Sequence, residues 1–379
     1  MTTNKVLKVL FILGTRPEAI KLAPLILAFK NDKDITTKVC ITAQHRQMLD
    51  QVLKFFLIDP DFDLNIMKDN QTLFDISAIG LKLLEPVLIE FEPNLIFVQG
   101  DTTTAFIGAL AGYYRKTSIA HVEAGLRSGN LFSPFPEEGN RKFISQVATF
   151  HFAPTKISAQ NLFDENIKSQ VHIVGNTVID ALFLGLGILK NQSDESISHF
   201  FSVVDFSKKI ILVTGHRRES FGEPFLNICN AIREIALRFK DQIEIVYPVH
   251  FNPNVRKPVN ELLKGLDNVH LIEPLSYQYL IWIMNRSYIV LTDSGGIQEE
   301  APSLGKPVLV MRDVTERMEG VVAGTAKLVG SDEKRIIEEI TILLTNQNEY
   351  EKMATATNPY GDGKSSERIL SIIKQHEAT

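Results

Sequence analysis

Short runs of apolar and β-branched residues alternate with longer segments of helical periodicity along most of the chain. This alternation is typical of parallel α/β proteins, in which a crossover helix follows each strand. One clear helical pattern covers residues 72–91, where leucine and isoleucine recur at helical spacing. The apolar runs predict strands at residues 6–13, 38–42, 63–67, 95–98, 118–122, 150–153 and 171–174, and then at 210–213, 243–247, 269–272, 288–291 and 307–311.

A polar stretch rich in Ser, Asp and Glu interrupts this pattern at residues 191–209. A chain of 379 residues is also long for one domain and fits two. We therefore expect an α/β protein with two Rossmann-like domains and a central cleft. The first domain is expected at residues 1–176, with the C-terminal helix at 364–379 as a candidate addition to it, and the second at residues 177–363.

The amino-acid composition narrows the classes of function that this protein can have. The chain is 44% hydrophobic and 22% charged, which fits a globular protein with large cores. Its formal net charge of −5 argues against non-specific nucleic-acid binding, so basic groups are expected to act locally on an anionic ligand. The sequence shows no secretory signal and no run of about 18 apolar residues, which predicts a cytoplasmic protein without membrane spans. Cys40 and Cys229 are too few for a disulfide scaffold and are expected to be reduced core residues.

Polar and charged residues gather where the predicted strands end. Ligands of open parallel sheets bind beyond the carboxyl ends of the strands. Any one of these polar ends would pass for a surface turn, but so many of them, from both halves of the chain, predict an active site in the cleft. They lie at residues 14–16, 44–46, 99–101 and 121–123 in the first half, and at 215–217, 249–250, 293–296 and 312–313 in the second.

A candidate phosphate seat lies in the second half, where residues 292–300 follow an apolar strand and open a helix. Gly295 and Gly296 let the backbone approach a ligand, and a helix N-terminus offers unpaired N–H groups to an anion. The alternative is an ordinary turn in which Ser294 caps the helix. Glu300 follows one turn later, and we expect this carboxylate to accept hydrogen bonds from ribose hydroxyls rather than to face a diphosphate.

Basic residues at the strand ends are candidates to balance the charge of a diphosphate, because arginine makes paired contacts with phosphate oxygens. His216 also ends a strand, where it would donate to a phosphate or shuttle a proton. Solvated surface positions for the basic residues, and a capping or core role for His216, are the alternatives. The basic candidates are Arg16, Lys21, Arg217, Arg218 and Arg317.

The first half of the chain also supplies several carboxylates. Asp101 and Glu123 end adjacent predicted strands, and Glu137 and Glu138 follow in a loop. Carboxylates that converge on one cleft suit proton transfer. Asp101 has the alternative role of N-cap for a helix that begins near Thr102. No βα junction carries the Gly-x-Gly-x-x-Gly fingerprint, and no Walker loop or zinc-ligand cluster is present, so we expect a catalyst that uses neither a dinucleotide cofactor nor a metal.

Seven segments of the sequence, in this order, resemble the bacterial non-hydrolysing UDP-N-acetylglucosamine 2-epimerases over residues 8–373. They lie at residues 14–18, 99–103, 121–127, 136–138, 214–219, 293–302 and 358–363. The resemblance implies a two-domain fold like that of the GT-B glycosyltransferases, and a homodimer. It implies catalytic roles for Asp101, Glu123, Glu137 and His216. It also implies substrate contacts from Arg16, Lys21, Leu275, Leu280, Ser294, Gly295, Gly296, Glu300 and Arg317, with Leu275 standing where some members of the family have glutamine.

The absence of a nicotinamide-binding motif fits the reaction that the resemblance implies. Carbon 2 of the sugar has no adjacent carbonyl, so its proton is not acidic enough for direct exchange. The remaining route removes UDP as the proton leaves carbon 2, which forms a glycal, and then adds UDP back after protonation from the other face. The expected function is therefore reversible interconversion of UDP-N-acetylglucosamine and UDP-N-acetylmannosamine, which supplies a precursor for bacterial surface polysaccharide. A hydrolysing epimerase, a GT-B glycosyltransferase and a non-catalytic sensor are the alternatives.

A second, regulatory site for the substrate is also expected from the resemblance. Some members of the family have arginine where this chain has Asn70. Capping and solvation of the helix at residues 45–56 is the alternative role for Gln44 and Gln47. The expected regulatory residues are Gln44, His45, Gln47, Gln71, Arg218 and His250.

Overall fold

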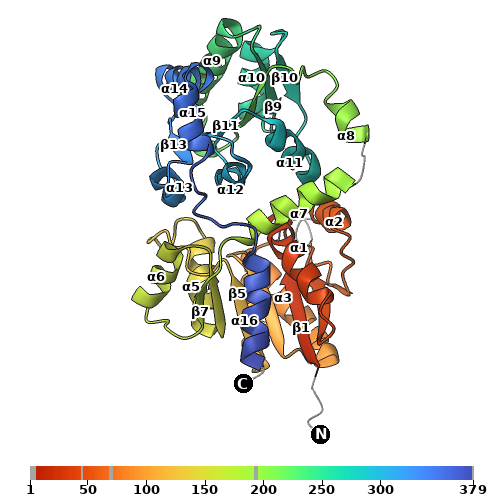
Figure 1. The fold of residues 1–379 in the computed structure, drawn as a ribbon. Coiled ribbons are helices and arrows are strands. Elements are labelled where there is room, and N and C mark those ends of the chain that lie inside the picture. The colour runs from red at the N-terminus through yellow and green to blue at the C-terminus, as the bar shows by residue number, and fades with distance from the viewer. Residues whose placement is uncertain (1–5, 44–45, 68–70, 192–194, 378–379) are drawn as a thin grey trace. The chain divides into compact units, whose positions relative to one another are not determined.

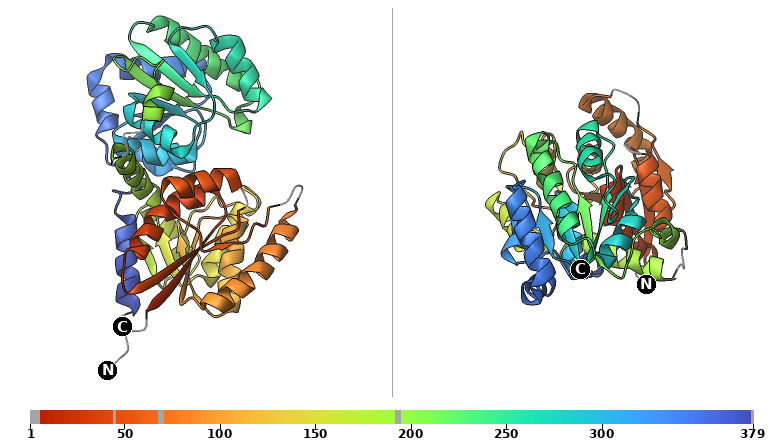
Figure 2. Two further views of the ribbon diagram at one scale, coloured as in Figure 1. Left: turned by 90° about the vertical axis from the view of Figure 1, so that its right-hand side faces the viewer. Right: turned by 90° about the horizontal axis from the view of Figure 1, so that it is seen from above.

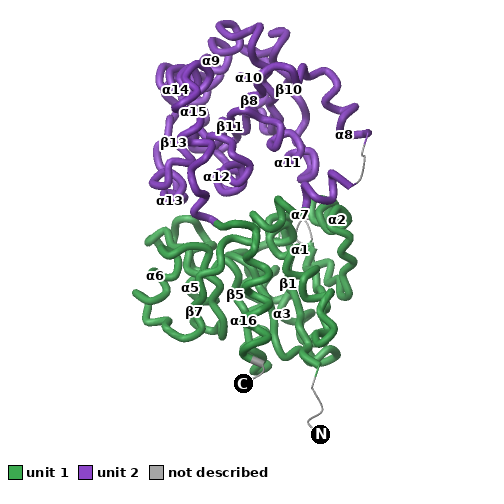
Figure 3. Tube along the Cα trace, viewed as in Figure 1, with its two compact units in different colours: residues 1–184, 361–379 green, residues 185–360 purple. Residues whose placement is uncertain are grey.

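The computed structural model of the chain describes residues 6–43, 46–67, 71–191 and 195–377. The chain forms two compact units, which Figure 3 shows in different colours. Unit 1 comprises Met1–Leu184 and Gly361–Thr379, and unit 2 comprises Gly185–Tyr360. The break between the units lies inside helix α7 (Thr177–Asn191), whereas the boundary expected after residue 176 falls just before that helix.

Unit 1 contains a seven-stranded sheet in which neighbouring strands run parallel. The strand order is β3-β2-β1-β4-β5-β6-β7, a doubly wound Rossmann order extended by one strand. The central strands are almost fully buried, as expected where helices cover both faces, and this explains their unbroken apolar runs. The strands are β1 (Leu7–Leu13), β2 (Ile35–Ile41), β3 (Phe62–Asp63), β4 (Leu95–Gln99), β5 (Ser118–Val122), β6 (Phe150–Ala153) and β7 (Val171–Ile173).

Helices cover both faces of this sheet. Helix α1 packs against α2 and α16, while α3, α4 and α5 pack side by side. Figure 2 (left) shows the blue helix α16 on one side of the sheet and the orange helix α3 on the other. Helix α16 belongs to unit 1: Ile369 and Ile373 are buried, and Lys374 pairs with Asp32 at 2.7 Å. The helices are α1 (Arg16–Lys30), α2 (Arg46–Phe55), α3 (Leu73–Phe91), α4 (Thr103–Tyr114), α5 (Glu137–Val147), α6 (Lys156–Asp164) and α16 (Ser365–Glu377).

Unit 2 repeats the same design with six parallel strands in the order β10-β9-β8-β11-β12-β13. Its helices are labelled in Figure 1, and its core joins β8, β9 and β11 to α9, α10 and α14. The strands are β8 (Lys209–Thr214), β9 (Ile243–Pro248), β10 (Val269–Ile272), β11 (Ile289–Thr292), β12 (Val308–Val310) and β13 (Ala326–Leu328). The helices are α8 (Glu195–Phe200), α9 (Glu223–Arg238), α10 (Pro253–Leu263), α11 (Tyr277–Arg286), α12 (Gly295–Glu300), α13 (Met318–Val322), α14 (Glu333–Thr345) and α15 (Gln347–Ala354), with short 3₁₀ turns η1 (Arg218–Ser220) and η2 (Ala301–Leu304).

The two parallel sheets confirm the predicted α/β class with two Rossmann-like halves. Every predicted strand overlaps an observed one, but two details were wrong. Strand β3 covers only Phe62–Asp63, not residues 63–67, and the edge strand β13 was not predicted. Both cysteines are free and buried, as predicted. Within the described part of the chain, no helix is long and apolar enough to cross a membrane.

Candidate active site

Both sheets have a topological switch point at which polar loops gather. In unit 1 this point lies between the neighbouring strands β1 and β4, and in unit 2 it lies between β8 and β11. Chain connections leave these strand pairs in opposite directions, so a crevice opens beyond their carboxyl ends. Many of the residues predicted from sequence follow β1, β4 and β5 in unit 1, and β8 and β11 in unit 2. Each switch point therefore brings several candidate residues to one edge of its sheet.

A buried glutamate joins the first two loops of unit 1. Glu18 Oε2 accepts the backbone N–H groups of Gly14 (3.1 Å) and Thr15 (2.7 Å). Its Oε1 accepts the hydroxyl of Thr102 (2.7 Å), which follows β4. Burial raises the pKa of Glu18 to about 7, against the opposing effect of these hydrogen bonds. The loop that carries Arg16, the first residue of α1, is thus tied to the loop that carries Asp101.

Arg141 of α5 holds the carboxylate of Asp101. Asp101 Oδ2 accepts hydrogen bonds from Arg141 Nε (2.8 Å) and lies 2.6 Å from Arg141 Nη2. The side-chain amide of Asn140 donates to the backbone oxygen of Asp101 (2.8 Å). The alternative that Asp101 caps α4 is wrong, because the N-cap is Thr102, whose hydroxyl accepts the N–H of Ala105. The carboxylate of Asp101 is oriented by a cation instead of a helix end.

Glu123, after β5, adopts a left-handed backbone conformation (φ 64°), which is uncommon for a residue other than glycine. Its Oε1 lies 2.5 Å from Lys21 Nζ and accepts the amide of Asn176 (3.2 Å). Its Oε2 accepts the side-chain amide of Gln99. A side chain on Gly100 would come within 3.5 Å of Glu123 Oε2, so this carboxylate lies beside the loop of Asp101. Glu123 thus pairs with Lys21 and lies beside the residue that precedes Asp101.

The first turn of α5 adds two more carboxylates. Glu138 is fully buried, accepts the backbone N–H of Ser128 (3.0 Å), and pairs with Arg141 Nη1 (3.0 Å). Glu137 is half-buried, and its Oε2 is buried without a hydrogen-bond partner among the described residues. Arg141 therefore bridges Glu138 and Asp101, while Glu137 keeps an oxygen that none of the described groups engages.

In unit 2, Asp293 fixes the loop that carries His216. Its Oδ2 accepts the backbone N–H groups of His216 (2.6 Å) and Arg217 (2.8 Å). Arg217 Nε donates to the backbone oxygen of Asp293 (3.0 Å), so this arginine braces the loop. The imidazole of His216 remains half-exposed and stacks on that of His250, with ring centroids 5.1 Å apart.

The predicted phosphate seat follows β11. Ser294 occupies the N-cap position of α12, but its side chain makes no capping hydrogen bond, which contradicts the alternative of a serine cap. A side chain on Gly295 would lie 3.0 Å from the guanidinium carbon of Arg317, so these two predicted residues are in contact. Arg317 Nε also donates to Glu299 Oε1 (3.1 Å).

The remaining predicted substrate contacts also lie in unit 2. Glu300 is buried and accepts the hydroxyl of Tyr277 (3.0 Å). Leu280 lies in α11, and Leu275 precedes that helix; both are half-buried. Gly296 is the second residue of α12, and a side chain there would lie 3.8 Å from Glu300 Oε2. Backbone, carboxylate and guanidinium groups thus surround the loop after β11.

The expected regulatory residues are divided between the units. Gln44 and His45 lie outside the described residues. In unit 1, Gln47 is exposed on α2, and Gln71 Nε2 donates to the backbone oxygen of Ile66 (2.8 Å). In unit 2, Arg218 is exposed at the start of η1 and His250 contacts His216.

Sequence reasoning assigned no orienting role to Glu18, Arg141, Asp293 or His121, although Asp293 and His121 lie among the polar strand ends that it noted. His121 Nε2 donates to the backbone oxygen of Gly100 (2.7 Å). Burial lowers the pKa of His121 to about 4, so the ring is neutral near pH 7. The signal available in the sequence was a histidine inside the apolar run of β5, and the structure shows that this side chain is fully buried.

Comparison with known proteins identifies the family. Residues 27–374 match the family model described as UDP-N-acetylglucosamine 2-epimerase. The protein of that name from Escherichia coli K12 is 54% identical over 374 residues, which cover 98% of this chain and 99% of the relative. A crystal structure of the Neisseria meningitidis UDP-GlcNAc 2-epimerase bound to UDP-GlcNAc is 51% identical, with a TM-score of 0.89, and covers 97% of this chain and 100% of that one.

A more distant structure is that of the Methanocaldococcus jannaschii UDP-GlcNAc 2-epimerase in complex with UDP-GlcNAc and UDP. It is 35% identical, with a TM-score of 0.79, and covers 97% of this chain and 100% of that one. Similarity over nearly the full length of each relative confirms the resemblance found in the sequence. The chain belongs to the UDP-N-acetylglucosamine 2-epimerase family.

Proposed function

We propose that the chain reversibly interconverts UDP-N-acetylglucosamine and UDP-N-acetylmannosamine by elimination and re-addition of UDP, and so supplies a precursor for surface polysaccharide. The observation that carries this proposal is the 54% identity to the Escherichia coli epimerase over almost the whole chain. The cluster of carboxylates in unit 1 supports it, because epimerisation at carbon 2 needs a proton removed from one face and another delivered to the opposite face.

The carboxylates Asp101, Glu123 and Glu137 are proposed to move these protons. Arg141 and Lys21 keep the carboxylates of Asp101 and Glu123 in place, which limits the reorganisation required during proton transfer. Glu137 adds a carboxylate whose Oε2 is buried without a partner among the described groups. Unit 1 then holds three carboxylates that would serve the two faces of carbon 2.

Groups of unit 2 are proposed to bind the nucleotide and to stabilise UDP as it leaves. His216 and Arg317 would balance the negative charge that develops on the diphosphate, beside the backbone of Ser294, Gly295 and Gly296. Arg16 and Lys21 of unit 1 would add positive charge. Glu300, already an acceptor for Tyr277, would accept ribose hydroxyls, and Leu275 and Leu280 would contact the uracil ring.

Incubation with UDP-N-acetylglucosamine alone, followed by NMR of the products, tests this proposal. The expected early product is UDP-N-acetylmannosamine. Free N-acetylmannosamine together with UDP would indicate the hydrolysing reaction, and a requirement for an acceptor sugar would indicate a glycosyltransferase. Binding without turnover would indicate a sensor.

We further propose that a second molecule of UDP-N-acetylglucosamine regulates the enzyme. Its expected contacts are Gln44, His45, Gln47 and Gln71 from unit 1, and Arg218 and His250 from unit 2. The stacking of His250 on His216 supports a link between this site and catalysis, because displacement of one ring disturbs the other. Such a ligand acts by shifting the population of conformations, to an extent set by its differential affinity.

The reverse reaction, from UDP-N-acetylmannosamine, is expected to start with a lag that a trace of UDP-N-acetylglucosamine removes. The Gln47→Ala variant, alone and with His250→Ala, should lose this response. Gln47→Ala is the cleaner probe because His250 touches His216. The exposed Lys54 on the same helix supplies the control: Lys54→Ala should keep the response. A reverse reaction at full rate from the first turnover, with no added UDP-N-acetylglucosamine, would refute the regulatory site.

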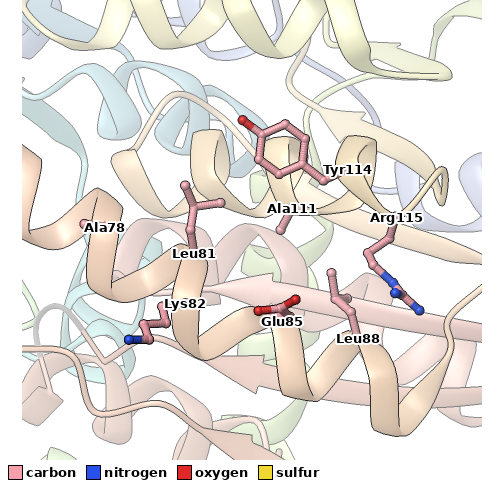
Figure 4. A pocket seen from close by; sticks show the side chains of 8 residues that line it. All are labelled: Ala78, Leu81, Lys82, Glu85, Leu88, Ala111, Tyr114 and Arg115. Atoms are coloured by element: carbon pink, nitrogen blue, oxygen red, sulfur yellow. The ribbon is translucent and has the colours of Figure 1, made fainter.

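We also propose that two copies of the chain associate. A groove of about 370 Å³ lies between α3 and α4 in unit 1, and Figure 4 shows the side chains that line it. Leu81, Leu88 and Tyr114 are apolar, while Lys82, Glu85 and Arg115 carry charges of both signs, a mixture that suits self-association. Phe74 on α3 is 87% exposed, which adds apolar surface on the same layer of helices. Sedimentation equilibrium at micromolar concentration is expected to give twice the chain mass, and a monomer mass would contradict the proposal.

A further inference from the structure

A buried carboxylate lies next to the candidate catalytic imidazole of unit 2. Asp293 is 3% exposed, and its Oδ2 is occupied by the backbone N–H groups of His216 and Arg217. Its Oδ1 is also buried, but it has no hydrogen-bond partner among the described residues. That oxygen lies 3.7 Å from His216 Nδ1, slightly beyond hydrogen-bonding distance. A buried carboxylate oxygen without a donor is costly, so a donor is expected there in the working enzyme.

We propose that Asp293 is a positioning residue for His216, and that its Oδ1 accepts a hydrogen bond from His216 Nδ1–H. The inference rests on the proposed role of His216. An ionised carboxylate is only an acceptor, so the bond places the imidazole proton on Nδ1 and leaves Nε2 as the nitrogen that exchanges protons. Because Oδ2 already fixes the backbone of this loop, we expect rotation of the half-exposed His216 side chain to close the remaining separation of 3.7 Å.

The other groups around His216 favour this arrangement. His250 stacks on the ring with an interplanar angle of 12°, and its Nδ1 accepts the backbone N–H of Asn252 (3.1 Å). Partial burial and the neighbouring His216 lower the pKa of His250, which favours a neutral ring. Two further groups at this loop act on its backbone: the Tyr247 hydroxyl donates to Gly215 O (3.1 Å), and Arg217 Nε donates to Asp293 O. Glu219 pairs with Arg312 (2.7 Å), and Arg218 is exposed. Asp293 Oδ1 is therefore the acceptor that meets the imidazole edge.

The proposed bond gives His216 a defined role. With Nδ1–H held by Asp293, Nε2 takes up one proton from the solvent, and the resulting cation is stabilised by the carboxylate behind it. Nε2 donates that proton to an oxygen of the leaving diphosphate, and the proton returns to Nε2 when UDP adds back. A carboxylate that selects the histidine tautomer in this way is a recurrent device in enzymes with unrelated folds.

The test is ¹⁵N NMR of the histidine rings in the full chain, with and without UDP. Subtraction of the His216→Asn spectrum assigns the signals of His216. We expect the Nδ1–H tautomer in the wild type. In Asp293→Asn, the asparagine oxygen can still accept the two backbone N–H groups, while its NH₂ group faces His216 Nδ1. The tautomer should then reverse, and kcat should fall about 10²-fold or more with a much smaller change in KM.

Tyr247→Phe is the matched control, because it removes another contact to the same loop and leaves Asp293 in place; it should retain the Nδ1–H tautomer. An Nε2–H tautomer in the wild type would overturn the proposal, even if Asp293→Asn does not fold. An unchanged tautomer in Asp293→Asn would also overturn it. Because the tautomer is read without turnover, its result stands whether or not the chain proves to be an epimerase.

Discussion

Replacement of Asp101, Glu123 or Glu137 by the corresponding amide is expected to lower turnover by about 10²-fold or more, while UDP binding largely survives. An amide keeps the size of the side chain but neither accepts a proton nor holds a full negative charge. The nucleotide contacts are proposed to lie mainly in unit 2, so UDP affinity should respond much less than kcat. This difference separates a role in proton transfer from a role in folding or binding.

Steady-state kinetics in both directions and calorimetric titration with UDP provide the measurements. Asp164→Asn is the control, because Asp164 lies in the same unit with an exposed side chain bonded only to Gln160 among the contacts described. Its turnover should stay close to that of the wild type. Near-normal turnover of Asp101→Asn would show that Asp101 serves only as a structural partner of Arg141.

Removal of the Arg141 side chain is expected to lower the free energy of unfolding by about 3–5 kcal/mol. The guanidinium lies between Asp101 Oδ2 and Glu138 Oε2, and the Glu138 side chain is fully buried. Arg141→Ala therefore leaves a buried carboxylate without its cation, which costs more than the loss of an exposed ion pair. Turnover should fall as well, because Asp101 loses the group that orients it.

Urea unfolding of the wild type and of Arg141→Ala measures this cost. The control is Arg238→Ala, which breaks the exposed pair between Arg238 and Glu234 on α9 and should cost at most about 1 kcal/mol. Equal losses of unfolding free energy in the two variants would contradict the claim that Arg141 stabilises the fold by pairing with two carboxylates.

The strands could be predicted where a buried apolar run is flanked by polar turns, as at β5 and β6. Prediction failed in part at two of the four edge strands, β3 and β13. Strand β3 ends early because Asn65 adopts a left-handed conformation (φ 43°). Strand β13 has only three residues, with an exposed lysine at its centre, so it carries no apolar run. Edge strands depend on pairing with a neighbour, which local sequence does not encode.

The candidate site likewise contains residues that the sequence revealed and residues that it did not. Local motifs at the strand ends revealed residues such as Asp101 and His216, because the carboxyl edge of a parallel sheet follows from the strand pattern. Their partners, Arg141 and Asp293, lie 40 and 77 residues away along the chain. Such pairs form only when the sheet and its helices assemble, so spacing along the sequence could not reveal them.

The reaction in deuterated water tests the central claim most directly. The chain is incubated with UDP-N-acetylglucosamine alone, and NMR follows carbon 2 of the sugar in the early product. Elimination and re-addition of UDP predict UDP-N-acetylmannosamine that carries deuterium at carbon 2, because the original proton is removed and replaced from the solvent. Unlabelled UDP-N-acetylmannosamine, or free N-acetylmannosamine as the main early product, would contradict the account.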